Sequence, residues 1–96
     1  MVVFVNTLRL TGDASELEAI YRDVAAHFSR QAGLIGFRLL RSTEDPAVYV
    51  NVAEWRDVES FRAATRHPAF RGARRISEVS AGDPHLCETV LEGGPA

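Results

Sequence analysis

The chain has 96 residues, of which 46% are hydrophobic and 25% charged, and its net charge is −2. This length allows one domain, and the composition is that of an ordinary globular protein. The charge balance argues against a nucleic-acid partner, because binding to phosphates needs clustered lysines and arginines.

The sequence carries no signal for export or for a membrane. Its single cysteine, Cys87, cannot form an internal disulfide or a cysteine-rich metal site. The N-terminus lacks a charged segment followed by a long apolar run, so we expect no signal peptide. No stretch approaches the roughly 18 apolar residues that a membrane span needs. We therefore expect a cytoplasmic protein with no membrane partner.

The chain begins with a predicted strand and a predicted helix. Residues 2–10 are rich in β-branched and aromatic side chains, which is typical of a strand. The residues that then recur at helical spacing, through about residue 30, form the apolar face of a helix: Leu17, Ile20, Tyr21, Val24, Ala25 and Phe28. Asp13 or Ser15 can cap this helix at its start, and Gly33 fits its stop.

A hairpin follows. Residues 34–43 and 47–55 predict two strands, and the segment between them, Glu-Asp-Pro-Ala, predicts a turn. Strands joined by so short a turn pair in antiparallel fashion.

The C-terminal part predicts a second helix and a last strand. Asp57 can cap the helix, and His67-Pro68 ends it. A short helical turn is expected over residues 70–76. The last strand spans residues 77–91, is interrupted at Gly-Asp-Pro, and has its best stretch at 85–91.

These elements predict a single α+β domain over residues 1–92 with a flexible tail over 93–96. The order βαββαβ is ferredoxin-like. Right-handed crossovers turn it into a four-stranded antiparallel sheet with both helices on one face. The first and third strands then lie side by side in the centre.

Both faces of this sheet are expected to be largely apolar. In the third strand Val48, Val50 and Val52 point to one face, and Tyr49 and Ala53 to the other. Two helices cover only one face, and the uncovered patch is large for a monomer. We therefore expect a homodimer that packs sheet to sheet, although a monomer that tolerates the patch is the alternative.

Three polar groups interrupt the apolar strands. Asn51 and Trp55 are four residues apart on one strand and share a face, while Asn6 lies on the neighbouring strand. A buried amide needs a hydrogen-bond partner. If the faces coincide, the three side chains meet in one cavity between sheet and helices. The alternative is that each amide satisfies a local backbone group and that Trp55 belongs to the core.

The usual catalytic motifs are missing from the sequence. His27, His67 and His85 are scattered without metal-binding spacing, so no metal site is expected. Neither a phosphate-binding loop, nor a dinucleotide fingerprint, nor a nucleophile elbow occurs.

The stretch YVNVAEWRDVESFRAATRHPAFR, residues 49–71, resembles the signature of the antibiotic biosynthesis monooxygenase superfamily. QAGLIGFRLLRSTEDP and the opening FVNTL match too, so the resemblance covers nearly the whole chain. It implies a dimeric α/β barrel. The nearest branch is that of the small oxygenases of aromatic polyketide pathways, which turn an anthrone into a quinone with O2 as co-substrate and no cofactor.

This resemblance also implies a set of catalytic residues. Asn6, Asn51 and Trp55 occupy the places of that branch's two asparagines and tryptophan, and Arg75 falls where some members have an arginine, with Arg74 as its near rival. Phe61 stands where some members carry a tyrosine. Trp55 is the only tryptophan, which disfavours the haem degradation of other relatives.

Two other functions stay open at this point. One is a different oxidoreductase of the superfamily, which oxidises a quinol or another small molecule. The other is a dimer that binds an aromatic ligand without catalysis or assists a cyclisation.

Overall fold

A computed structural model describes residues 1–95, and the last residue of the predicted tail, Ala96, lies outside the described part. The described residues form seven elements: β1 (Val2–Leu10), α1 (Ala14–Phe28), β2 (Leu34–Arg41), β3 (Val48–Trp55), α2 (Val58–Arg66), α3 (Gly72–Val79) and β4 (Ser80–Glu88). No helix among them has the length and apolar character needed to cross a membrane.

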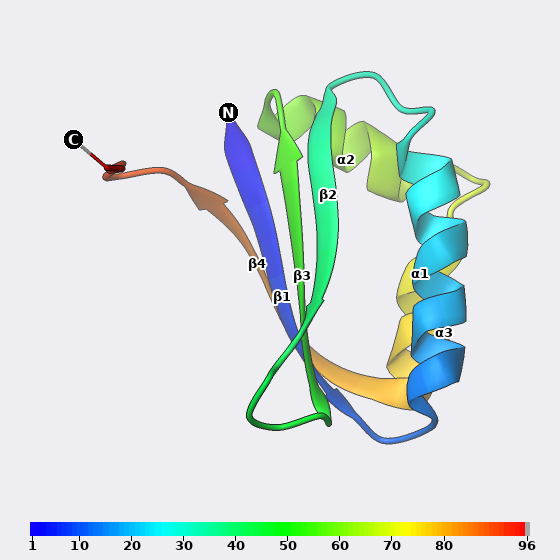
Figure 1. The fold of residues 1–96 in the computed structure, drawn as a ribbon. Coiled ribbons are helices and arrows are strands. Elements are labelled where there is room, and N and C mark those ends of the chain that lie inside the picture. Colours follow the sequence, from blue (N-terminus) through cyan, green and yellow to red (C-terminus); the bar gives the residue numbers. More distant parts are fainter. Residues whose placement is uncertain (96) are drawn as a thin grey trace.

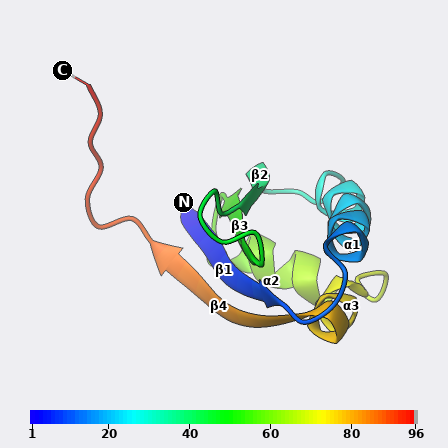
Figure 2. The same ribbon diagram turned by 60° about the horizontal axis from the view of Figure 1, so that its bottom comes forward.

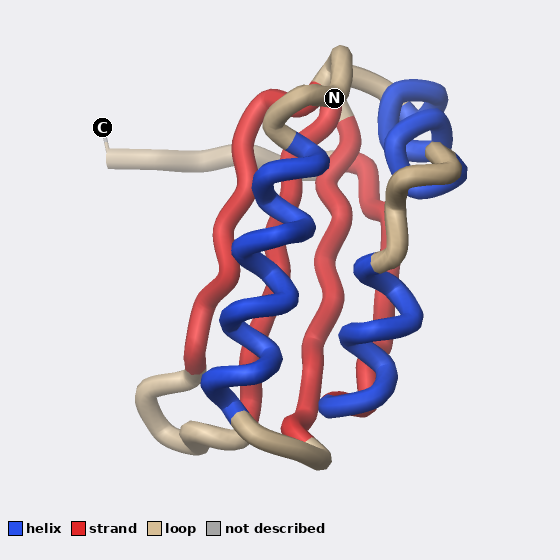
Figure 3. Tube along the Cα trace, turned by 90° about the vertical axis from the view of Figure 1, so that its right-hand side faces the viewer, coloured by secondary structure: helices blue, strands red, loops and turns tan. Residues whose placement is uncertain are grey.

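The four strands form one antiparallel sheet, and the helices cover one of its faces (Figures 1 and 3). The strand order is β2-β3-β1-β4, so β1 and β3 lie in the centre. The ferredoxin-like βαββαβ fold is thereby confirmed, with α3 in the place of the predicted short turn.

Aspartates begin the first two helices. The Asp13 carboxylate accepts the N–H of Ser15 at 2.8 Å, and the Asp57 carboxylate accepts the N–H of Ser60 at 2.8 Å. These bonds satisfy N–H groups that the first turn of a helix leaves free. Hydrogen bonds from the two serines also lower the pKa of both carboxyls. Asp13 is thus the cap among the two predicted candidates.

Gly33 is not the helix stop that the sequence predicts, because α1 already ends at Phe28. Its φ of +91° lies in the left-handed region that favours glycine. A Cβ atom at this position would also collide with the side chain of Ser60 on α2. Gly33 therefore allows the chain to turn into β2 close against α2.

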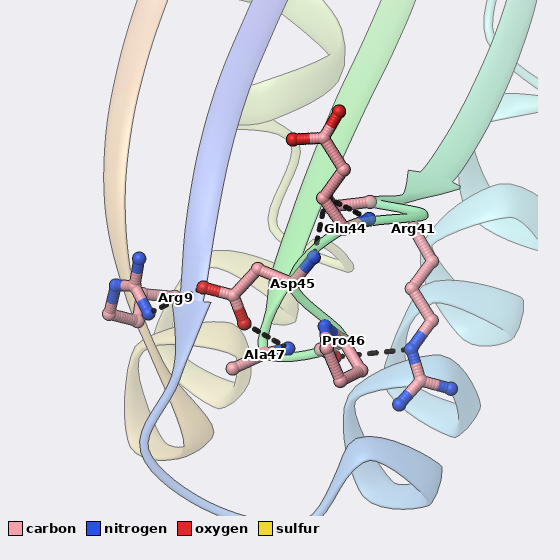
Figure 4. Close-up of polar contacts among 7 residues, drawn as sticks. Arg9, Arg41, Glu44, Asp45, Pro46 and Ala47 are labelled. Atoms are coloured by element: carbon pink, nitrogen blue, oxygen red, sulfur yellow. Dashed lines mark hydrogen bonds and ion pairs between the residues drawn. The ribbon is translucent and has the colours of Figure 1, made fainter.

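The predicted hairpin is confirmed, and side chains hold its turn (Figure 4). The Asp45 carboxylate accepts the N–H of Ala47 at 3.0 Å and forms an ion pair with Arg9 on β1 at 3.3 Å. On the other side, Nε of Arg41 donates to the Pro46 carbonyl at 3.1 Å. The turn is thereby tied to both β1 and β2.

The last strand differs from its prediction. α3 continues to Val79, so β4 begins at Ser80 and not at residue 77. β4 also passes through Gly-Asp-Pro without interruption. Pro84 is tolerated because β4 is an edge strand, where one side of the backbone needs no partner.

The residues after β4 lead away from the sheet (Figure 2). β4 ends at Glu88, before the predicted end at residue 91. Val90 and Leu91 are 89% and 88% exposed. Their apolar character therefore does not reflect a place in the sheet.

The two faces of the sheet have different surroundings. The inner face packs against the helices and contains Leu8, Tyr49, Ala53 and Trp55, all at most 2% exposed. The outer face carries no helix (Figure 1). Its centre is a stripe of partly buried valines from the two central strands: Val3, Val5, Val48, Val50 and Val52. We call this set the valine stripe.

Candidate active site

A cavity of about 660 Å³ lies between the inner face of the sheet and the helices. Most of its wall is apolar and aromatic, with contributions from β1, β3, β4 and all three helices; Phe4, Phe28, Phe61 and Phe70 are its aromatic hydrocarbon rings. Such a mostly apolar cavity with a few polar groups is typical of a small-molecule site.

Asn6 and Asn51 lie side by side in this wall. They are direct partners in the register between β1 and β3, and both line the cavity. Asn51 is only 3% exposed, and its Oδ1 atom has no hydrogen-bond partner in the described part of the chain. The expectation that the two amides share one face and one cavity is confirmed.

The neighbouring edge strand fixes the orientation of the Asn6 amide. Its Oδ1 atom accepts the backbone N–H of Asp83 at 2.9 Å. Gly82 makes room for this contact, because a Cβ atom there would lie 2.9 Å from the same oxygen. Since an N–H group can only donate, the oxygen of Asn6 faces β4. Its NH2 group is then left as the donor available to a ligand.

Trp55 does not meet the two amides in the cavity, contrary to the prediction from the sequence, because it lies behind the cavity wall. Its side chain is fully buried, and it is not among the residues that line the cavity. The indole packs edge-on against Phe28 and Phe61 at ring-centroid distances of 5.2 and 5.9 Å, and both of these rings do line the cavity. Its Nε1 atom has no hydrogen-bond partner among the described residues. A donor without a partner thus lies one aromatic layer away from the cavity.

The two candidate arginines of α3 point in different directions. Nη1 of Arg75 forms an ion pair with Asp23 on α1 at 2.8 Å, and Arg75 is not among the residues that line the cavity. Arg74 does line it, as does Arg71 just before the helix. The catalytic role expected of Arg75 stays a prediction. The Arg74 side chain lies at the edge of the cavity wall, 92% exposed, with its Nε atom 3.9 Å from the Glu78 carboxylate.

Tyr21 on α1 is a cavity residue that we expected only as part of the core face of a helix. It is 3% exposed and lines the cavity. Burial raises the pKa of its hydroxyl to about 12, and the nearby Asn51 amide opposes this shift. The signal in the sequence that could have indicated this position is a single tyrosine hydroxyl on a helix face that otherwise carries only hydrocarbon side chains.

The wall of the cavity offers cations and neutral polar groups. Among its described residues there is no aspartate, glutamate, histidine or cysteine. The described part of the chain also contains no cluster of three such residues that could hold a metal ion. The site therefore suits an aromatic ligand with polar or anionic oxygens.

Comparisons with known proteins agree with this fold. The family model described as antibiotic biosynthesis monooxygenase matches residues 1–76. Deoxynogalonate monooxygenase of Streptomyces nogalater is 35% identical over 97 residues, which cover 97% of this chain and 82% of that protein.

Solved structures give the same result. SnoaB, a cofactor-independent oxygenase from Streptomyces nogalater, superposes with a TM-score of 0.91 at 33% identity, over 99% of this chain and 97% of its own. A variant of MhuD with two manganese protoporphyrin IX molecules per active site has a TM-score of 0.74 at 27% identity, over 99% and 100% of the two chains. By its sequence and by its fold, the chain belongs to the antibiotic biosynthesis monooxygenase family.

Proposed function

We propose that this protein is a cofactor-independent monooxygenase that oxidises an anthrone-like aromatic polyketide intermediate to a quinone with O2. The observation that carries the proposal is the pair of neighbouring amides, Asn6 and Asn51, in the wall of an otherwise apolar cavity. The relatives named deoxynogalonate monooxygenase and cofactor-independent oxygenase support it. No metal, flavin or other cofactor is required.

The substrate supplies the electrons in this reaction. Loss of a proton from the CH2 group between the rings gives an anion whose charge spreads to the carbonyl oxygen. The anion passes one electron to O2, and the radical pair combines to form a C–O bond. After protonation, the hydroperoxide loses the remaining hydrogen of that carbon together with hydroxide as the O–O bond breaks. The products are a C=O group and one water molecule.

Asn6 and Asn51 would stabilise the anion. Their amide N–H groups can donate to the carbonyl oxygen as it becomes an enolate, and one such preorganised donor is worth about 3 kcal/mol. The apolar rings around them exclude water, which strengthens these bonds. Trp55 would hold O2 or the peroxide through its N–H, once the rings in front of it move aside. Arg75, or Arg74 from its place in the wall, would add positive charge. We assign no base.

We also propose that the protein works as a homodimer in which the valine stripes of two copies pack together. The outer face of the sheet carries no helix (Figure 1). Contact with a second copy would remove its half-buried valines from water, which stabilises the assembly. The cytoplasmic location expected from the sequence stays a prediction.

Purified protein free of metal and flavin tests the reaction directly. We expect it to oxidise an anthrone such as dithranol or emodinanthrone in air faster than the spontaneous reaction, with one O2 consumed per quinone formed. Absorbance and an oxygen electrode measure the two quantities. Tight binding without oxygen uptake would favour a ligand-binding or cyclase-like dimer, and oxidation of quinols alone would favour another oxidoreductase.

Gly82→Ala tests the orientation of the Asn6 amide. The new Cβ atom would lie 2.9 Å from Oδ1 of Asn6 and displace this side chain from the Asp83 N–H. We expect a loss of turnover of about tenfold, because the donor leaves its position. Gly36→Ala is the matched control, since a Cβ atom there meets nothing within 4 Å. Equal turnover in both variants would contradict the assigned orientation.

A further inference from the structure

Tyr21 is a polar residue of the cavity wall that has no role in the reaction described above. It comes from α1, which faces Asn6 and Asn51 across the cavity. Its ring packs against Phe37 of β2 at a centroid distance of 6.1 Å. This packing limits the directions in which the phenol hydroxyl can point.

The surroundings of Tyr21 suit a hydrogen-bond donor. Burial holds the pKa of its hydroxyl near 12, so the phenol keeps its proton at neutral pH. Asn51 is the polar side chain that affects this pKa, which places the amide and the hydroxyl close together. No described carboxylate lines the cavity to accept the phenol proton.

Tyr49, the second tyrosine of the chain, is used differently. It is equally buried at 2% exposure, but its hydroxyl donates to the Glu18 carboxylate at 2.5 Å. It is also not among the residues that line the cavity. The hydroxyl of Tyr49 is therefore already bonded to a carboxylate, while that of Tyr21 lies at the cavity beside the Asn51 amide.

We propose that Tyr21 is a further catalytic residue, whose phenol O–H donates to the substrate oxygen that becomes the enolate oxygen. One substrate oxygen that lies next to both the Tyr21 hydroxyl and the Asn51 amide then receives hydrogen bonds from the helix side and from the sheet side. This inference rests on the proposed function and adds a donor from the opposite wall of the same site. The phenol acts as a donor and not as the base, because it keeps its proton at neutral pH.

Tyr21→Phe removes the hydroxyl and keeps the ring. We expect turnover of the anthrone to fall by about 10- to 100-fold, in the range found for the loss of one donor to an oxyanion. Without O2, the bound anthrone should ionise at a pH about 1–2 units higher than in the wild type, since each tenfold loss of anion stabilisation raises its pKa by one unit. The absorbance of the bound anion measures this shift, which a purely structural role would leave unchanged.

Tyr49→Phe is the matched control, because it removes a phenol hydroxyl outside the cavity. It should lower the melting temperature by breaking the bond to Glu18, and leave the pKa of the bound anthrone unchanged. An equal shift of that pKa in both variants would overturn the inference.

A second readout does not depend on turnover. The chain has only two tyrosines, so protein grown with 3-fluorotyrosine gives two ¹⁹F signals, which the two variants assign. Anaerobic addition of an anthrone should move the Tyr21 signal more than the Tyr49 signal.

The outcomes separate the two proposals. Oxidation by the wild type, with turnover of Tyr21→Phe within twofold of it and the Tyr21 signal unmoved, would overturn the inference and leave the proposed function standing. Absence of oxidation by the wild type, with a Tyr21 signal that still moves, would overturn the proposed function and support Tyr21 as a donor to the ligand.

Discussion

Asn51→Ala is expected to lower turnover of an anthrone by 100-fold or more without destabilising the fold. The activity should fall because this amide is the more deeply buried of the two donors, and a donor to a developing oxyanion is worth about 10²–10³ in rate. Stability should hold or rise, because the Oδ1 atom of Asn51 has no hydrogen-bond partner among residues 1–95. Such a buried polar atom costs about 1–3 kcal/mol in the folded state.

Steady-state kinetics and thermal unfolding of the same samples test both halves of this prediction. Tyr49→Phe should show the opposite behaviour, since its hydroxyl is bonded to Glu18 and lies away from the cavity. A residue kept for stability loses stability when it is truncated, whereas one kept for function loses activity. Turnover of Asn51→Ala within tenfold of the wild type would contradict the role proposed for this amide.

Strand alternation was sufficient to predict the sheet side of the site. A period of two residues puts Asn51 and Trp55 on one face, and the structure agrees. The face of Asn6 depended on the register between β1 and β3, where a slip of one residue reverses every side chain. The register pairs Asn6 with Asn51 directly. Alternation also does not show how far a side chain lies from the cavity. It therefore could not predict that the rings of Phe28 and Phe61 separate Trp55 from the cavity.

The helix side of the site was harder to predict. Successive residues of a helix point about 100° apart, so spacing from Trp55 alone cannot decide between Arg74 and Arg75. The answer depends on how α3 packs against α1, where Asp23 binds Arg75. The sequence likewise predicts only that Tyr21 belongs to the apolar face of its helix. Its helical spacing shows that it faces inward, but not that it meets a cavity.

The edge strand shows a different limit. Gly and Pro within a predicted strand usually mark a break, yet β4 pairs with β1 across its whole length. The outcome depends on the place of the strand in the sheet, which local sequence does not encode. Gly82, which the sequence predicts to be part of a break in the strand, instead gives room to the Asn6 amide.

Val50→Glu is expected to convert the proposed homodimer into a monomer. Val50 lies in the middle of the outer face, between Thr7 of β1 and Leu40 of β2 in the register of the sheet. A two-fold interface uses the same patch on both subunits, so one substitution places two carboxylates in it. Burying an unpaired charge costs several kcal/mol, and a glutamate side chain on a strand at the centre of the interface cannot easily reach water.

Light scattering after size exclusion should then give a mass near the 10.6 kDa of one chain for the variant and roughly twice that for the wild type. Ala63→Glu is the control, because it adds the same charge to an exposed position on α2, the opposite side of the sheet. A dimeric Val50→Glu variant would show that the valine stripe is not the interface. Because the cavity lies between the helices and the inner face of the sheet, away from the valine stripe, the monomer should still bind an anthrone anaerobically. Loss of the dimer without loss of binding would separate assembly from the site.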